Sequence, residues 1–364
     1  MIEVARTPRP LLFSDAFDFL AVGGASLIVP LSLGLYVKLN ATWNMTGPLA
    51  TLLWLALILP HYTSSYQLLY WDRRGKIFRE PSYFFAAVLV PVAAAGLLTA
   101  VYFNRPLLTM AGLLHMLFFL SGWHYAKQAY GATVALSAAK SRALSMAEKS
   151  AIRINLLALA VVSFVIPNTL GSFPYEGVYY HSLGFPSWFG TFCLCALAAT
   201  MGGLALALRR RLREGPGIPW VAAAAFLSIY AWGFPLIFYP QIFHAFRDVP
   251  FVAALHSLQY LVFVMSLRLS RRPAVFSGAL PGVSPLIGVA LSLLAVVIFG
   301  DVLARLLPQW LDRALTYDRA ALGAGFFVFA AAFFINIHHY FIDSVIWRGD
   351  NHEFRALITE KSLG

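Results

Sequence analysis

Runs of about 20 predominantly apolar residues recur along almost the whole chain, and such runs can cross a hydrocarbon layer about 30 Å thick. The chain of 364 residues is 60% hydrophobic and 12% charged, with a mean hydropathy of +0.72, whereas soluble domains carry about 25% charged residues. These values predict an all-α, polytopic helical membrane protein that forms one integral membrane domain over residues 1–364. Ten transmembrane helices are expected, at residues 15–37, 47–70, 81–103, 106–136, 150–171, 186–208, 218–241, 250–268, 284–307 and 319–346.

The positive charges are distributed unevenly between the two sets of connections that ten spans create. Twenty lysine and arginine residues fall in the termini and the even-to-odd connections, and six fall in the odd-to-even connections. Cytoplasmic loops carry such an excess, so both termini are expected to be cytoplasmic, in a bacterial inner (cytoplasmic) membrane. The net charge of +11 is therefore attributed to topology and to contact with the anionic headgroups of the lipid bilayer, not to nucleic-acid binding.

Ionisable residues inside the predicted spans are few, and they are informative because burying them in hydrocarbon is costly. A single intramembrane histidine is most often a helix–helix hydrogen-bond partner. Here, however, four spans (the second, fourth, eighth and tenth) all carry histidine. The ionisable residues away from the span ends are His61, His115, His124, Lys127, His256, His338, His339 and Asp343.

The four histidine-bearing spans run in the same direction, so the depth of each histidine follows from the distance to the next cytoplasmic charge. The first charged residue of the following loop is 11 residues after His61, 12 after His256 and 10 after His338. At about 1.5 Å per residue, these separations are about 15–18 Å. His124 lies somewhat deeper, 16 residues before Lys140. Histidines at a similar depth on four helices predict one shared site near the bilayer midplane.

Each histidine motif also contains groups that can form hydrogen bonds near the site. A histidine ligand needs a partner on its second ring nitrogen, because that partner fixes the tautomer and the ring orientation. The residues expected to support the ligands or to line a substrate slot are Ser65, Lys127, Gln128, Gln259, Tyr260, Asn336 and Asp343. His115 precedes His124 by nine residues and so falls on the opposite helix face, which indicates a structural role.

In their order along the chain, these motifs resemble those of the Brp/Blh family of membrane-integral bacterial carotene 15,15'-dioxygenases. They read PHYTSSYQ (60–67), WHYAKQAYG (123–131), HSLQY (256–260) and NIHHYFID (336–343). The resemblance implies an all-helical fold that holds a non-haem iron among histidines. It places His61, His124, His256 and His338 at the motif positions, the last because it stands five residues before the aspartate of an Ile-Asp pair. Tyr260 stands where the family tends to have another histidine.

Neutral imidazole is a natural ligand for iron, zinc or copper. The resulting hypothesis is a mononuclear non-haem iron centre that activates dioxygen for an apolar or lipid substrate. Of the adjacent pair, His338 is favoured as the ligand, with His339 and Asp343 as hydrogen-bonded support. The two histidines point about 100° apart, and both are kept as metal-ligand candidates. The alternatives are a di-iron desaturase-like or hydroxylase-like site, a haem-binding electron-transfer subunit, and a transporter or accessory subunit.

Overall fold

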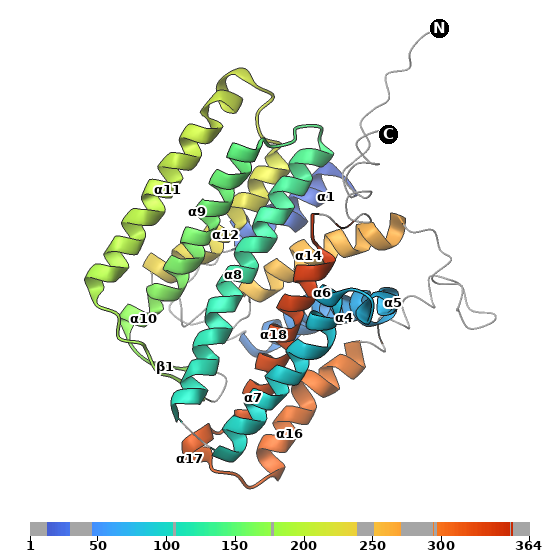
Figure 1. Ribbon diagram of the computed structural model, residues 1–364, viewed down its shortest axis with the longest axis vertical. Helices are drawn as coiled ribbons and strands as arrows, with labels where there is room; N and C mark the ends of the chain where they lie inside the picture. Colours follow the sequence, from blue (N-terminus) through green and yellow to red (C-terminus); the bar gives the residue numbers. More distant parts are fainter. Residues whose placement is uncertain are drawn as a thin grey trace, which may run out of the picture.

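The computed structural model describes residues 13–29, 46–104, 107–175, 178–238, 251–270, 294, 297–349 and 351. Within these ranges the regular structure is helical apart from one short hairpin, which confirms the all-α prediction (Figure 1). With η marking π-helical segments, the elements are α1 Asp15–Phe19, η1 Leu20–Gly24, α3 Thr46–Leu53, η2 Trp54–Ile58, α4 Leu59–Gln67, η3 Leu68–Asp72, α5 Arg74–Ile77, α6 Pro81–Phe84, η4 Phe85–Leu89, α7 Val90–Asn104, α8 Leu107–Ala139, α9 Met146–Val165, α10 Pro167–Leu170, β1 Phe173–Tyr175, β2 Val178–Tyr180, α11 Ser187–Glu214, α12 Trp220–Phe238, α14 Phe251–Ser270, η6 Val302–Leu306, α16 Leu307–Ala314, α17 Arg319–Leu322 and α18 Phe326–Ile346.

Four helices in the described part of the chain are long and apolar enough to cross a membrane. Two shorter apolar helices accompany them, Trp220–Trp232 and Phe251–Leu267. The prediction of ten spans is therefore too high for the residues that the structure describes. Parts of the predicted spans at 15–37, 218–241 and 284–307, and both chain ends, lie outside these residues, so the cytoplasmic position of the termini stays a prediction, as does the single domain. The four helices are Pro81–Asn104, Met146–Leu170, Ser187–Glu214 and Phe326–Ile346.

The predicted span at 47–70 illustrates why apolar windows overcount membrane crossings. The chain there is one helical run, α3–η2–α4–η3, and its first half is apolar. Its second half carries the polar sequence HYTSSYQ, in which His61, Ser64 and Ser65 are buried. These polar side chains face other helices of the protein, because lipid offers them no hydrogen-bond partners.

A proline sets the course of this run just before the first histidine of the site. Pro60 lacks an N–H, and its ring crowds the carbonyl four residues earlier, which belongs to Ala56 in η2. The wider π-helical turn of η2 accommodates that carbonyl, and the backbone is again α-helical at Leu59 (φ −66°, ψ −45°). Because His61 follows Pro60 directly, this turn helps to fix the direction in which the imidazole points.

Two groups of helices pack on either side of α8 (Figure 1). In the first group, Leu156 and Leu159 of α9 are buried together with Leu197 of α11 and residues of α8 and α12. In the second group, Phe329 and Phe333 of α18 are fully buried with residues of α7 and α8. Because α8 belongs to both groups, it connects the α9–α11–α12 side of the protein to α18.

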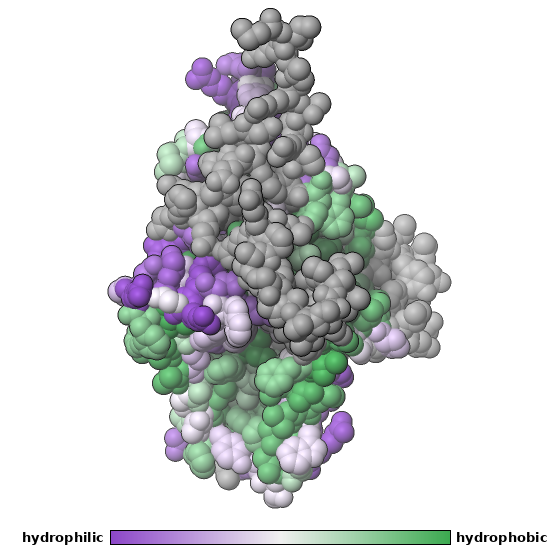
Figure 2. Space-filling model, turned by 90° about the vertical axis from the view of Figure 1, so that its right-hand side faces the viewer, coloured by the Kyte–Doolittle hydropathy of each residue, from purple (hydrophilic) through white to green (hydrophobic). Residues whose placement is uncertain are grey.

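The protein surface carries large apolar side chains that are rare on soluble proteins. Along α11, Trp188 is 67% exposed, Phe192 62% and Leu206 70%. Figure 2 shows apolar side chains over a broad area of another side of the molecule, with hydrophilic side chains gathered beside it and at its ends. Contiguous apolar surface of this extent is typical of contact with lipid or with another protein. Together with the four apolar helices, it indicates a membrane protein.

The length of α11 generates a prediction about topology. Its 28 residues extend about 42 Å, so the loop before it and the loop after it should emerge on opposite sides of the bilayer. Basic residues cluster at its C-terminal end, where Arg211 and Arg213 lie in the last turn, and this end is expected to be cytoplasmic. A cytoplasmic reporter fused after Gly215 and a periplasmic reporter fused after Gly184 should both be active; activity of one reporter type at both positions would refute the arrangement.

Candidate metal centre

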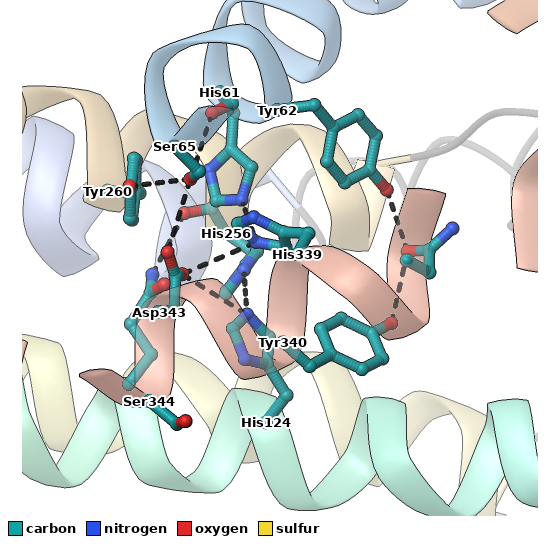
Figure 3. Close-up of polar contacts among 12 residues, drawn as sticks. His61, Tyr62, Ser65, His124, His256, Tyr260, His339, Tyr340, Asp343 and Ser344 are labelled. Carbon is teal, nitrogen blue, oxygen red and sulfur yellow. Dashed lines mark hydrogen bonds and ion pairs between the residues drawn. The ribbon is translucent and has the colours of Figure 1, made fainter. Parts of the chain in front are cut away.

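Four helices each direct one histidine to the same point inside the protein (Figure 3). The residues are His61 of α4, His124 of α8, His256 of α14 and His339 of α18. All are buried, with exposed fractions of 5% or less. One ring nitrogen from each lies within 4.8 Å of the corresponding nitrogens of the other three. The prediction of a histidine cluster shared by four helices is therefore confirmed.

The spacing of the ring nitrogens is close to that of ligands around a single ion. The Nε2 atoms of His61 and His339 are 2.6 Å apart, and those of His124 and His256 are 3.1 Å apart. Neighbouring donors that lie about 2.0–2.2 Å from one metal ion are separated by about 3 Å. The four imidazoles thus fit an ion as donors. Imidazole suits zinc, copper, iron and nickel alike, so the donor set does not identify the metal.

Of the two adjacent histidines on α18, the structure places His339 in the cluster and His338 outside it. His338 packs against Tyr66, Tyr70 and Phe334, and its Nε2 is 3.1 Å from the Tyr70 hydroxyl. That hydroxyl donates its proton to the Ala87 carbonyl at 2.6 Å, so His338 Nε2 must itself be the donor to Tyr70. The sequence-based preference for His338 over His339 is therefore reversed, because a rotation of about 100° separates the two side chains.

His115 takes no part in the cluster, in keeping with its expected structural role. Its Nδ1 lies 2.6 Å from the Ala111 carbonyl, and its Nε2 lies 3.3 Å from Asn168 Oδ1. Its ring packs against Tyr180 of β2, with ring centroids 4.7 Å apart. This histidine therefore ties α8 to α10 and the β-hairpin, on the side of α8 away from the other histidines.

The carboxylate of Asp343 lies next to the cluster in an unexpected orientation. It was predicted to act with His339 as hydrogen-bonded support beside the favoured ligand His338. Instead its Oδ2 is 3.3 Å from His339 Nε2 and 3.8 Å from His124 Nε2, the nitrogens that face the other histidines. Its Oδ1 accepts a hydrogen bond from Ser65 Oγ at 3.1 Å, and Ser65 Oγ is 2.6 Å from the Tyr260 hydroxyl. Ser65 and Tyr260 thus support the carboxylate rather than an imidazole.

Gln128 and Gln259, which were predicted to support the histidine ligands, form hydrogen bonds with backbone carbonyls and with each other. Gln128 Nε2 donates to the His256 carbonyl at 3.0 Å and to Gln259 Oε1 at 2.9 Å. Gln259 in turn donates to the Val22 carbonyl at 2.6 Å. These bonds fix α14 against α8 and η1, and so position His256 through its backbone. Lys127 is exposed, with its ammonium 4.2 Å from the centre of the Trp123 ring.

Aromatic residues pack around the histidine cluster. The Tyr340 ring stacks on His124 with centroids 4.4 Å apart. Asn336 Oδ1 accepts from the Tyr62 hydroxyl at 2.7 Å and from the Tyr340 hydroxyl at 3.1 Å. Asn336, predicted as a histidine partner, thus anchors two tyrosines. Ser121, 2.6 Å from the Tyr340 hydroxyl, was missed by the sequence analysis, although its position three residues before His124 places it on the same helix face.

No family model, curated protein or solved structure matches the chain. The features that bear on function are the geometry of the histidine cluster and the apolar character of the helices that carry it.

The adjacent histidines of α18 offer a matched test of the metal centre. His339→Gln removes a ring nitrogen from the cluster, whereas His338→Gln removes one that faces Tyr70. Removal of a ligand should weaken metal affinity by at least about 100-fold, since even supporting residues cost 10–100-fold, and His338→Gln should keep wild-type affinity. Elemental analysis of detergent-purified protein after titration with metal measures both. Greater metal loss in His338→Gln than in His339→Gln would contradict the assignment.

Proposed function

We propose that the protein is a membrane-embedded, oxygenase-like enzyme that holds a non-haem iron ion between His61, His124, His256 and His339 and oxidises a lipophilic substrate with dioxygen. The observation that carries the proposal is the convergence of four buried imidazoles within 4.8 Å in a chain with helices apolar and long enough to span a membrane. Burying four polar rings together is unfavourable unless something satisfies them, and intramembrane ionisable residues usually mark functional sites.

Iron is preferred among the metals that imidazole binds because of the motif pattern and the membrane setting. The order of the histidine motifs resembles that of the Brp/Blh dioxygenases, with His339 in place of His338 as the ligand from the last motif. A structural zinc site would be closed by its four ligands. When bound, iron supplies the site with the capacity to bind and activate dioxygen.

The substrate class follows from the surroundings of the site. A molecule dissolved in the bilayer reaches a buried centre without passing through water, and aromatic rings line the cluster here. The simplest balanced reaction is cleavage of a carbon–carbon double bond, in which both atoms of one dioxygen molecule end up in two carbonyl products. This stoichiometry needs no external reductant, and a polyene or an unsaturated acyl chain provides the double bond.

The chain's own residues perform the binding, orientation and exclusion of water. The four histidines are 5% exposed or less, so bulk water does not compete for their nitrogens. Tyr340 on His124 and Tyr125 on His256, each with a centroid separation of 4.4 Å, restrict ring rotation. Residues held in place before the substrate arrives need no reorganisation during the reaction.

The proposal includes a location and a topology. The protein would lie in the bacterial cytoplasmic membrane with both termini inside and further spans beyond the four described, in agreement with the alternation of basic residues along the chain. The bilayer would then be both its solvent and the source of its substrate.

The geometry of the cluster disfavours two alternatives. A haem iron needs two axial nitrogens about 4 Å apart, twice the usual metal–nitrogen bond length, with a porphyrin plane between them. The Nε2 atoms of His61 and His339 are only 2.6 Å apart, with two more imidazoles beside them. A di-iron site needs a second group of ligands, yet His115 and His338 bond elsewhere. A transporter or accessory subunit is the interpretation that absence of metal would support.

The decisive experiment combines metal analysis with oxygen consumption. Detergent-purified protein should contain iron without a Soret band and should consume dioxygen when a polyene or an unsaturated lipid is supplied. His61→Ala and His256→Ala should each lower bound iron and abolish substrate-dependent oxygen uptake, because each removes one of the four converging nitrogens.

His115→Ala is the control for these variants, since it removes an imidazole that lies outside the cluster but on α8, the helix that carries His124. It should keep iron and oxygen uptake close to wild type. A Soret band, or protein that binds no metal after reconstitution, would refute the proposal. Loss of iron in His115→Ala as complete as that in His124→Ala would point instead to a di-iron site.

A further inference from the structure

The carboxylate of Asp343 is buried at the edge of the histidine cluster. Asp343 is 8% exposed and lies one helical turn after His339 on the same face of α18. Its Oδ2 lies 3.3 Å from His339 Nε2 and 3.8 Å from His124 Nε2. A buried carboxylate is very costly unless it is paired with a cation or coordinates a metal.

The two oxygens of this carboxylate have different surroundings. Oδ1 is occupied by the Ser65 hydroxyl at 3.1 Å, and Ser65 is held by Tyr260 at 2.6 Å and by the His61 carbonyl at 3.3 Å. These bonds come from α4 and α14, so they fix the carboxylate from the side away from α18. Oδ2 is thereby turned toward the histidine nitrogens, as Figure 3 shows.

The identity of the facing nitrogens separates two roles for the carboxylate. A carboxylate that orients a metal-bound histidine accepts a hydrogen bond from the ring nitrogen that does not bind metal. Asp343 Oδ2 instead faces the Nε2 atoms of His339 and His124, which also face His61 and His256. Neighbouring donors around one ion with bonds of about 2.1 Å are about 3 Å apart, and Oδ2 stands at close to that distance from His339 Nε2.

We propose that Asp343 is the fifth protein ligand of the metal, bound through Oδ2, and that Ser65 and Tyr260 are the residues that position it. This inference rests on the metal centre of the proposed function and deepens it. Four imidazoles and one carboxylate give five donors, and the single negative charge offsets part of the charge of a divalent ion. In octahedral coordination, one position remains for dioxygen or another small ligand, as iron, manganese or cobalt allows and a closed tetrahedral zinc site does not.

Wild-type protein substituted with cobalt(II) provides a test that does not depend on a variant folding. Four-coordinate cobalt absorbs visible light strongly, whereas five- and six-coordinate cobalt absorbs weakly. Asp343 as a ligand predicts the weak spectrum. The strong spectrum of a tetrahedral four-histidine site would overturn the inference while leaving the metal centre itself intact.

The matching variant is Asp343→Asn, which keeps the size of the side chain and removes its charge. It should bind iron(II) and cobalt(II) at least about 10-fold more weakly than wild type. Ser65→Ala, which frees Oδ1 but leaves the carboxylate, should weaken binding less. Asp301→Asn is the control, because Asp301 is also buried (7% exposed) but pairs with Arg305 and should not change metal affinity.

The outcomes separate this inference from the proposed function. If wild-type protein binds metal and Asp343→Asn binds it equally tightly, Asp343 is not a ligand, and the histidine centre stands. If wild-type protein binds neither iron(II) nor cobalt(II), both the proposed metal centre and the proposed role of Asp343 as its fifth ligand are refuted. Weak cobalt absorption in wild type, together with loss of affinity in Asp343→Asn but not in Asp301→Asn, supports the inference.

Discussion

Four imidazole rings from α4, α8, α14 and α18 meet at one buried point, where each carries polar nitrogens that bulk water does not reach. Such groups raise the free energy of the folded state unless they bond to one another or to an ion. The helices must therefore be held at fixed positions by other contacts. Gln128 and Gln259 link α8, α14 and η1, while Ser65 and Asp343 link α4 to α18. Side-chain hydrogen bonds between these helices thus hold the four imidazoles in place.

The local backbone explains how these helices present their side chains inward. In α18, His339, Tyr340 and Asp343 lie within about one turn, so one helix supplies an imidazole, an aromatic wall and a carboxylate. In α8, Ser121 and His124 lie on the same helix face. The Tyr340 hydroxyl forms a hydrogen bond with Ser121, and the Tyr340 ring stacks on His124. These spacings of three and four residues are a direct consequence of helix periodicity.

That periodicity also marks the limit of what the sequence could predict. The expectation that histidines on several helices share one site followed from apolar runs and residue counts, and the structure brings His61, His124 and His256 together. The choice between His338 and His339 did not follow, because neither helix rotation nor side-chain direction can be read from one sequence. For the same reason the sequence, which predicted Asp343 as hydrogen-bonded support, did not show that its carboxylate faces the Nε2 atoms of His339 and His124. Among the described residues, fewer helices than the ten predicted are long and apolar enough to cross a membrane. Apolar windows do not register whether polar segments such as HYTSSYQ form hydrogen bonds within the protein.

The two sides of the cluster differ in a way that constrains its chemistry. On one side, Asp343, Ser65 and Tyr260 form a polar, hydrogen-bonded group; on the other, Tyr62 and Tyr340 turn their hydroxyls onto Asn336 (Figure 3). With its hydroxyls engaged in this way, the tyrosine side presents mainly ring surface to the centre. Apolar groups can pack against these rings without displacing any hydrogen bond, whereas the Asp343 side offers a charged oxygen, so the two sides of the cluster differ in polarity.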